Sequence, residues 1–223
     1  MGKLYSYQPT LGMAQADRIE ANYAAKILEW LHSVENLLTT VAAITYTDKG
    51  CTLTPLAENI NGKKISIEVS GTNIDIAYTT GNASPAWSTF SVALKDDPLL
   101  YIISDDDIVA IGASGNTAAV ALCSGTKYDG TECGVLIGSI SSQFEWYIAN
   151  GPRSDYFSKG NNYSCTNKYS AFCFKPFTCY ADGIIVSHVM EVDGGMGLPG
   201  IGQIYTVNDE TYVQFQQNFA LKV

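Results

Sequence analysis

Basic residues and histidines are scarce in this chain, and their scarcity argues against one class of function. The 223 residues include 13 Lys and Arg against 22 Asp and Glu, which gives a formal net charge of −9. A surface that binds nucleic acid requires clustered basic side chains, and the few basic residues here are scattered along the sequence. We therefore expect no direct binding of nucleic acid.

The sequence also lacks long hydrophobic runs. No apolar run approaches the roughly 18 residues that predict a transmembrane helix. The first residues, MGKLYSYQPTLGM, contain no hydrophobic core of a signal peptide. We expect neither insertion into a membrane nor secretion by the general route.

The cysteines lack the close spacing that zinc sites use. No two of the six are separated by the two residues of a zinc knuckle. In a chain without a secretory signal, buried reduced thiols are favoured over structural disulfides and over metal ligation. The six are Cys51, Cys123, Cys133, Cys165, Cys173 and Cys179.

Candidate catalytic residues are few. His32 falls in a helical pattern and His188 in the middle of a strand pattern, so both are interpreted as packing or surface residues. A pair formed by Cys179 and His188 has no nucleophile motif around it. The aspartates at 105–107 could face a cation, but a solvated turn is the better interpretation, because neighbouring strand positions point to opposite faces. We expect a protein that is not an enzyme, with no catalytic residue, no cofactor and no bound metal ion.

One nominal nucleotide motif is present near the end of the chain. Gly195, Gly197 and Gly200 have the G-x-G-x-x-G spacing, and a strand pattern over 183–192 precedes them. The motif requires a helix to follow, whose N-terminus receives the pyrophosphate. Residues 202–215 instead predict a hairpin, because β-branched and aromatic residues surround an Asn-Asp turn. A glycine-rich loop between two strands is therefore the favoured interpretation.

One amphipathic helix is predicted over 14–43, after an extended arm over 1–13. Apolar residues recur there at steps of three and four, which is the period of a helix with one buried face. The recurring residues are Ile19, Tyr23, Ile27, Trp30, Val34, Leu37 and Val41. Leu28, Leu31 and Leu38 widen this stripe, and we expect it to be too wide for one domain to cover.

Strand patterns dominate the rest of the chain. Apolar residues alternate from Ile65 to Val69 and again from Ile74 to Tyr78, on either side of a short turn. The predicted fold is α+β, with one long N-terminal helix followed by a mainly antiparallel β body, sandwich-like or barrel-like. We expect a helix plus an antiparallel sheet over 14–115 and an all-β region over 116–223, with the two regions either separate or one continuous domain.

This profile favours a surface built for other proteins, since aromatic residues commonly anchor interfaces. We expect the arm to gain order only against a neighbouring protein; the alternative is a frayed terminus without a role. The predicted interface residues are Leu4, Tyr5, Tyr7, Tyr23 and Trp30. The alternative is a ligand-binding or adhesion module with an aromatic site around an exposed loop over 151–167. Its predicted residues are Trp146, Tyr147, Tyr156 and Phe157.

The last tenth of the chain has a recognisable pattern. Gly202 is followed by an apolar strand at 204–207, a polar turn at 208–210, a Tyr-containing strand at 212–215, and an apolar-Lys-apolar tail at 221–223. This ending resembles the endings of structural proteins from tailed bacteriophages and phage-tail-like particles. The resemblance implies a virion component of the neck, tail or baseplate, assembled in the host cytoplasm. Its partners would be copies of itself and other virion structural proteins.

Overall fold

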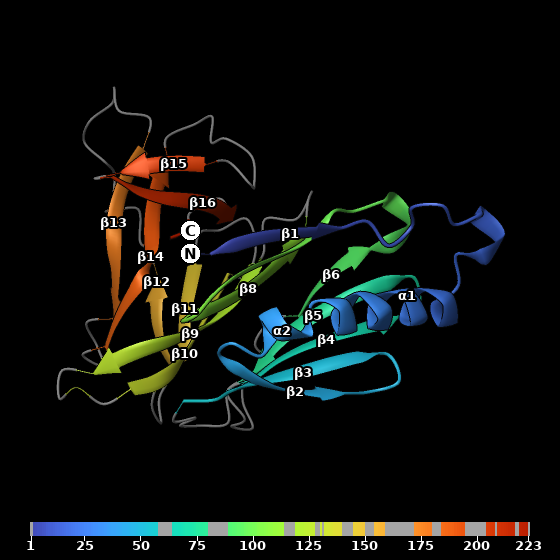
Figure 1. Cartoon of the computed structure of the whole chain (residues 1–223), viewed down its shortest axis with the longest axis horizontal. Coiled ribbons are helices and arrows are strands. Elements are labelled where there is room, and N and C mark those ends of the chain that lie inside the picture. Colours follow the sequence, from blue (N-terminus) through green and yellow to red (C-terminus); the bar gives the residue numbers. More distant parts are fainter. Residues whose placement is uncertain are drawn as a thin grey trace.

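The computed structural model contains mostly antiparallel β-structure (Figure 1). It describes residues 2–57, 64–79, 89–113, 119–127, 130, 132–139, 145–149, 154–158, 172–179, 184–194, 204–207, 209–216 and 219–222. The predicted mainly antiparallel β body is confirmed. In this described part the strands form two sheets and no closed barrel.

The helical segment is shorter than the sequence predicted. Instead of one helix over 14–43, the structure has a 3-10 turn η1 (Gln15–Asp17), helix α1 (Glu20–Ser33) and a single turn α2 (Glu35–Leu38). A further 3-10 turn, η2 (Leu94–Asp96), precedes the seventh strand. Among the described residues, neither α-helix has the length and apolar character needed to cross a bilayer.

Local hydrogen bonds explain the break in the helix. The Ser33 hydroxyl donates to the Trp30 carbonyl at 2.7 Å, and Val34 has left helical geometry with φ −112° and ψ 11°. After α2, the Thr39 hydroxyl donates to the Glu35 carbonyl at 2.9 Å. Hydroxyl side chains that bond to nearby carbonyls compete with the helix ladder. The apolar period therefore continues through 34–41 although the helix does not.

The smaller sheet has five antiparallel strands in chain order. They are β2 (Ala42–Tyr46), β3 (Gly50–Pro55), β4 (Lys64–Ser70), β5 (Asn73–Thr79) and β6 (Thr89–Ala93). Helix α1 packs on β3 and β4. The alternation predicted around Ile65 and Ile74 is confirmed, since one face of β4 and β5 is buried while the other carries polar and small residues.

The larger sheet has twelve strands and contains both ends of the chain. Its main path runs β1-β7-β8-β9-β14-β17-β16-β15, with β10 to β13 attached beside it. The strands are β1 (Lys3–Tyr7), β7 (Leu100–Asp105), β8 (Ile108–Ala113), β9 (Ala119–Lys127), β10 (Glu132–Ser139), β11 (Glu145–Ala149), β12 (Ser154–Ser158), β13 (Phe172–Cys179), β14 (Ile184–Gly194), β15 (Ile204–Val207), β16 (Glu210–Gln216) and β17 (Phe219–Lys222).

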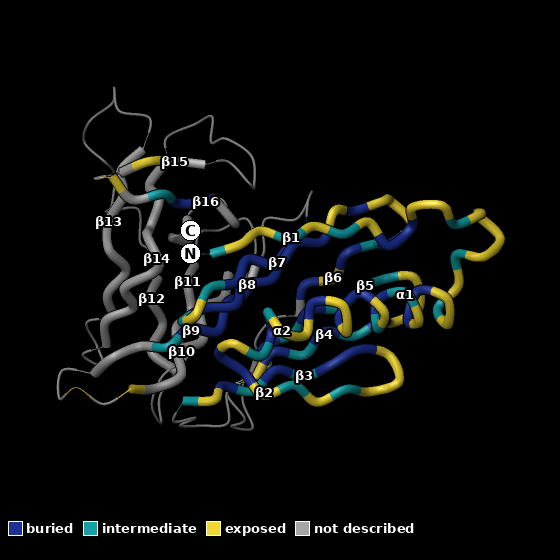
Figure 2. The backbone as a smooth tube through the Cα atoms, in the orientation of Figure 1, coloured by how far each residue is buried: buried dark blue, intermediate teal, exposed yellow. Residues whose placement is uncertain are grey.

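Strands β7 and β8 are buried on both faces (Figure 2). Leu100 and Ile102 belong to the core shared with α1 and the five-stranded sheet. The alternate positions, such as Tyr101 and Ile103, are also buried but lie outside that core. Strand β16 contacts β8, and its Tyr212 is buried. The middle of the molecule is therefore a β layer with protein on each side.

The expected division between residues 115 and 116 stays a prediction. Strand β8 precedes it, β9 follows it, and the two strands pair from Ile108 opposite Cys123 to Gly112 opposite Ala119. One sheet thus continues across the expected boundary.

The hairpin predicted after the glycine-rich motif is confirmed. Strands β15 and β16 pair antiparallel, with Val207 opposite Glu210 and Asp209 in a left-handed conformation at φ 64°. The glycines at 195, 197 and 200 lie outside the described residues. The next element that the structure describes is a strand and not the helix that dinucleotide binding requires.

Candidate functional site

The N-terminal strand lies at the edge of the larger sheet. Strand β1 pairs antiparallel with β7, from Lys3 opposite Ser104 to Tyr7 opposite Leu100. Within the described part of the chain, β7 is its only strand partner. The backbone groups on the other side of β1 therefore form an open edge, which is a template for a further strand.

Tyr7 holds this strand in register. Its ring stacks on Trp30 of α1, with centroids 5.3 Å apart and an interplanar angle of 9°. Its hydroxyl donates to the Lys26 carbonyl at 3.3 Å. Burial raises the pKa of Tyr7, and the negative charge of Glu29 raises it further. The sequence predicted an arm without order in the isolated chain, and this is wrong because β7 and α1 of the same chain bind it.

The five predicted interface residues differ in how far they are exposed. Leu4 is exposed, Tyr5 and Tyr7 are half-buried, and Tyr23 and Trp30 are buried in the core. The expectation that one domain leaves the helix stripe uncovered is met only at Ile19, which is exposed, because the five-stranded sheet and β7 to β9 together enclose the other members. Of the five, Leu4 is the side chain that faces solvent most fully.

A connector, residues 8–19, joins β1 to α1 at one end of the molecule (Figure 1). The connector carries two exposed apolar side chains, Leu11 at 76% and Ile19 at 54% exposure. Ile19 is the N-cap residue of α1 and makes no capping hydrogen bond. Ser, Thr, Asp and Asn are the residues that satisfy this position. The connector therefore exposes apolar surface where a polar residue would stabilise the helix.

The connector is attached to the β6–β7 loop by exposed polar contacts. The Gln8 side chain donates to the Asp97 carbonyl at 3.5 Å, and Arg18 donates to the Lys95 carbonyl at 3.1 Å. The Arg18 guanidinium also lies 3.8 Å from the Asp97 carboxylate. Long or exposed contacts of this kind contribute little to stability. Leu99, at the end of the loop, is exposed as well.

Buried polar atoms without partners lie in the connector and at its junction with the helix. Thr10 Oγ1 and Arg18 Nε have no hydrogen-bond partner among the described residues, and neither has the hydroxyl of Tyr23. Thr10 is 2% exposed and Tyr23 is 0% exposed. An unsatisfied buried hydroxyl costs about 1–3 kcal/mol. The present conformation of the connector therefore leaves buried polar groups without hydrogen bonds, which lowers its stability.

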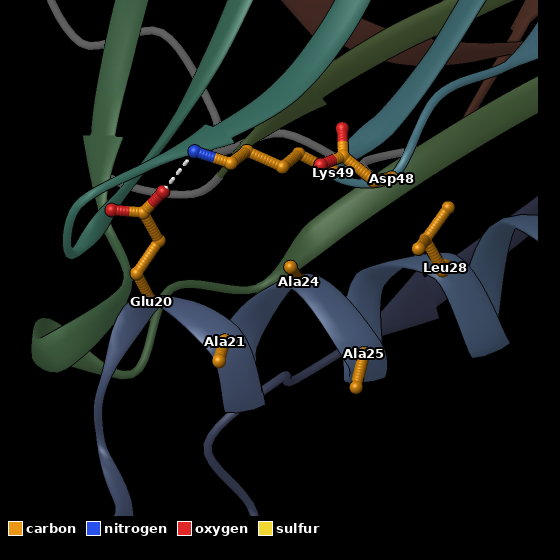
Figure 3. Close-up of a pocket in the computed structure, with 7 residues that line it drawn as sticks. All are labelled: Glu20, Ala21, Ala24, Ala25, Leu28, Asp48 and Lys49. Atoms are coloured by element: carbon orange, nitrogen blue, oxygen red, sulfur yellow. Dashed lines mark hydrogen bonds and ion pairs between the residues drawn. The ribbon is translucent and has the colours of Figure 1, made fainter.

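A groove of about 460 Å³ lies between α1 and the β2–β3 turn (Figure 3). Its floor on α1 is apolar, formed by Ala21, Ala24, Ala25 and Leu28. Its rim carries three charged side chains, and two of these, Glu20 and Lys49, form an ion pair.

Glu20 joins the start of α1 to two hairpin turns. Besides Lys49 of the β2–β3 turn, its carboxylate accepts a hydrogen bond from the Gly71 amide of the β4–β5 turn at 3.1 Å. The hydrogen bond and charge of Lys49 lower the pKa of Glu20. The same pair raises the pKa of Lys49. This charge pair positions the helix on its sheet.

His32 is a surface residue, as the sequence predicted. Its ring packs against Tyr46 with centroids 4.0 Å apart, and its Nδ1 lies 3.5 Å from the Glu35 carboxylate. The Tyr46 hydroxyl donates to the same carboxylate at 2.8 Å. Burial, together with this bond to Glu35, raises the pKa of Tyr46. The cluster fastens α2 to the edge strand β2. The side chain of His188 lies outside the described part.

The aspartates at 105–107 form the β7–β8 turn, as predicted. Asp105 ends β7, and its carboxylate accepts a hydrogen bond from the Asp106 amide at 2.9 Å.

Two cysteines have described side chains, and both are buried free thiols. Burial, followed by the charge of Glu68, raises the pKa of Cys51 to about 12. Burial also raises the pKa of Cys123. Protonated thiols in such surroundings are unreactive. Reduced thiols at the other four positions stay a prediction, because those side chains lie outside the described residues.

The predicted ligand residues meet in one hairpin. Strands β11 and β12 pair with Trp146 opposite Phe157 and Tyr147 opposite Tyr156. Neighbouring positions of a strand belong to opposite faces of the sheet. The register therefore joins the four as two pairs and assigns the pairs to different faces.

The sequence interpretation missed Leu11, Arg18 and the exposure of Ile19. The signal was present at Ile19, since an isoleucine directly before the helix is an unfavourable N-cap. The helical period instead includes Ile19 as the first residue of the apolar stripe.

The chain was compared with protein-family models, with curated proteins and with solved structures. None of these comparisons finds a match.

Proposed function

We propose that this chain is a non-enzymatic structural subunit that assembles in several copies through its N-terminal edge. The setting we propose is a tailed-phage virion, at the neck, tail or baseplate, assembled in the host cytoplasm. Its partners are copies of itself and other virion structural proteins. The resemblance of the C-terminal segment supports this setting.

The observation that carries the proposal is where apolar surface is exposed. Among the described residues, five large hydrophobic side chains are exposed, and four of these lie on β1, on the connector or at the loop it contacts. They are Leu4, Leu11, Ile19 and Leu99; the fifth is Leu56. Exposed apolar surface bordered by polar residues marks protein–protein contacts, and the open edge of β1 lies in the same region.

Native mass measurement and light scattering at tens of micromolar test the proposal. We expect a defined oligomer with cyclic symmetry, or incorporation into purified particles. Leu11→Asn should shift the distribution toward monomer, because it removes the most exposed apolar side chain of the connector. Leu56→Asn is the matched control, since Leu56 is 62% exposed but lies in the smaller sheet's β3–β4 connection. A monomer that is also absent from particles would contradict the proposal.

The second candidate function is ligand binding or adhesion through the β11–β12 hairpin. The pairing of Trp146 with Phe157 on one face of this hairpin favours it. Co-sedimentation with purified bacterial cell-wall polysaccharide tests it. We expect Trp146→Ala and Phe157→Ala to abolish sedimentation and Leu56→Asn to leave it unchanged. Equal sedimentation of all variants, or none with the unmodified chain, would exclude this site for that ligand.

A further inference from the structure

We propose that β1 is exchanged between copies of this chain, so that residues 3–7 of one copy pair with β7 of another. This inference rests on the proposed multi-copy assembly and specifies its mechanism. In the exchanged state the connectors of two copies cross, and they bury Leu11 and Ile19 against each other.

The acceptor side is specific for this strand. The edge of β7 takes residues 3–7 in one register, and the Trp30 ring and the Lys26 carbonyl receive Tyr7. A second copy carries an identical strand, so it reproduces every one of these contacts. We therefore take the partner to be another copy of the chain, whose identical strand fits this register and this aromatic stack.

The connector has the properties of a hinge. Its polar contacts to the β6–β7 loop are exposed, its Met13 side chain packs against the core, and its buried atoms Thr10 Oγ1 and Arg18 Nε lack partners among the described residues. Gly12 is in the left-handed region at φ +78°, with nothing near the position of a Cβ. A different path for the connector therefore costs mainly the packing of Met13 and the burial of Pro9 and Thr10, because its exposed polar contacts contribute little.

The connector is also long enough to reach a neighbour. Twelve extended residues span about 40 Å. Exchange preserves the hydrogen-bond ladder between β1 and β7. It also buries Leu11 and Ile19, which are exposed when β1 pairs with β7 of its own chain. This added burial stabilises the exchanged oligomer relative to the monomer. The oligomer is favoured further at high protein concentration, by mass action.

Engineered disulfides in the full chain show whether β1 pairs with β7 of the same copy or with β7 of another copy. Leu4 lies opposite Ile103 and Lys3 opposite Ser104, and directly opposed strand residues lie within disulfide range. The variants L4C/I103C and K3C/S104C are oxidised after assembly and analysed under denaturing, non-reducing conditions. The second pair keeps the test valid if replacing the buried Ile103 prevents folding, because Ser104→Cys changes little volume and costs the hydrogen bond from the Ser104 hydroxyl to the Leu37 carbonyl.

We expect the assembled fraction to contain interchain disulfides, which link two copies covalently. The monomer fraction should contain only intrachain disulfides. The four single-cysteine variants and the unmodified chain, carried through the same oxidation, should give neither product. Assemblies that contain only intrachain disulfides would overturn strand exchange while leaving the proposed function standing. A chain that stays monomeric and is absent from particles would overturn both.

Discussion

Gly50 is a position where the backbone of the smaller sheet admits no side chain. A Cβ at this residue would overlap the Ile67 carbonyl of the paired strand β4. The obstacle is backbone within a ladder, so it cannot rotate away as a side chain could. We expect Gly50→Ala to destabilise the protein by about 3 kcal/mol, at the upper end of overpacking costs, measured by urea unfolding.

Gly12→Ala is the matched control, because it makes the same substitution in open space. Gly12 has no neighbour near the Cβ position but has φ +78°, so the alanine should cost about 1 kcal/mol from the left-handed conformation alone. Equal losses for the two variants would contradict the close approach of β3 and β4.

Glu20 stabilises the folded protein by an amount that depends on pH. Lys49 lowers the pKa of Glu20 in the folded protein, so the contribution is complete above the unfolded carboxyl pKa of about 4.3. It is lost as the pH falls through the lowered, folded value. We therefore expect Glu20→Gln to reduce Tm at pH 7 and to have no effect once the wild-type carboxylate is protonated. The difference will be small, since the pair is exposed.

Glu29→Gln is the control for this measurement, because Glu29 is an exposed carboxylate on the same helix. It should leave the pH profile of Tm close to that of the wild type. A Glu20→Gln profile that runs parallel to the wild type from pH 7 to pH 3 would show that the ion pair does not link α1 to the β2–β3 turn.

At the scale of elements, α1 begins on a residue that does not cap it. We expect Ile19→Ser to stabilise the protein by about 1 kcal/mol, because a serine hydroxyl accepts a hydrogen bond from a free amide in the first turn. The same variant removes an exposed apolar side chain, so it should weaken assembly. Thermal unfolding and native mass measure the two effects separately.

Ile19→Ala separates the two effects of that substitution. Alanine also removes the isoleucine side chain but cannot cap the helix. It should weaken assembly as serine does without raising Tm. If serine and alanine raised Tm equally, relief of apolar exposure and not capping would be the cause.

The elements differ in how far the sequence predicted them. Strands β4 and β5 were predictable because their alternating burial and their turn are local features of 64–79. The break of the helix at Val34 was not predictable, because the apolar period continues beyond this residue. Only the hydrogen bonds from hydroxyl side chains to nearby carbonyls explain the break. The pairing of β1 with β7 joins residues far apart in the sequence, from Lys3 opposite Ser104 to Tyr7 opposite Leu100, which no local pattern encodes. Tyr7 and Trp30 were predicted as anchors of an interface with other proteins, and the pattern could not show that they stack on each other within the chain.

The molecule as a whole is organised by the β7–β9 layer. Core residues such as Leu100 and Val109 face α1 and the smaller sheet. Tyr101, Ile103 and Ile108 are equally buried but lie outside that core. Tyr101 also lies over Gly112 of β8, where a Cβ would overlap its ring. Both sides of this layer therefore depend on other parts of the chain, and the two halves of the sequence are coupled through it.

This coupling makes a prediction about the expected boundary after residue 115. A fragment of residues 1–115 retains the smaller sheet, α1, β1, β7 and β8, but it lacks β9, which pairs with β8, and β16, which contacts it. Buried apolar positions of β7 and β8, including Ile103 and Ile108, would then face water. We expect the fragment to aggregate or to bind the dye ANS strongly, without the cooperative thermal transition of the full chain. The full chain, purified in parallel, is the control and should bind little dye. A soluble fragment that melts cooperatively would instead establish residues 1–115 as an independent domain.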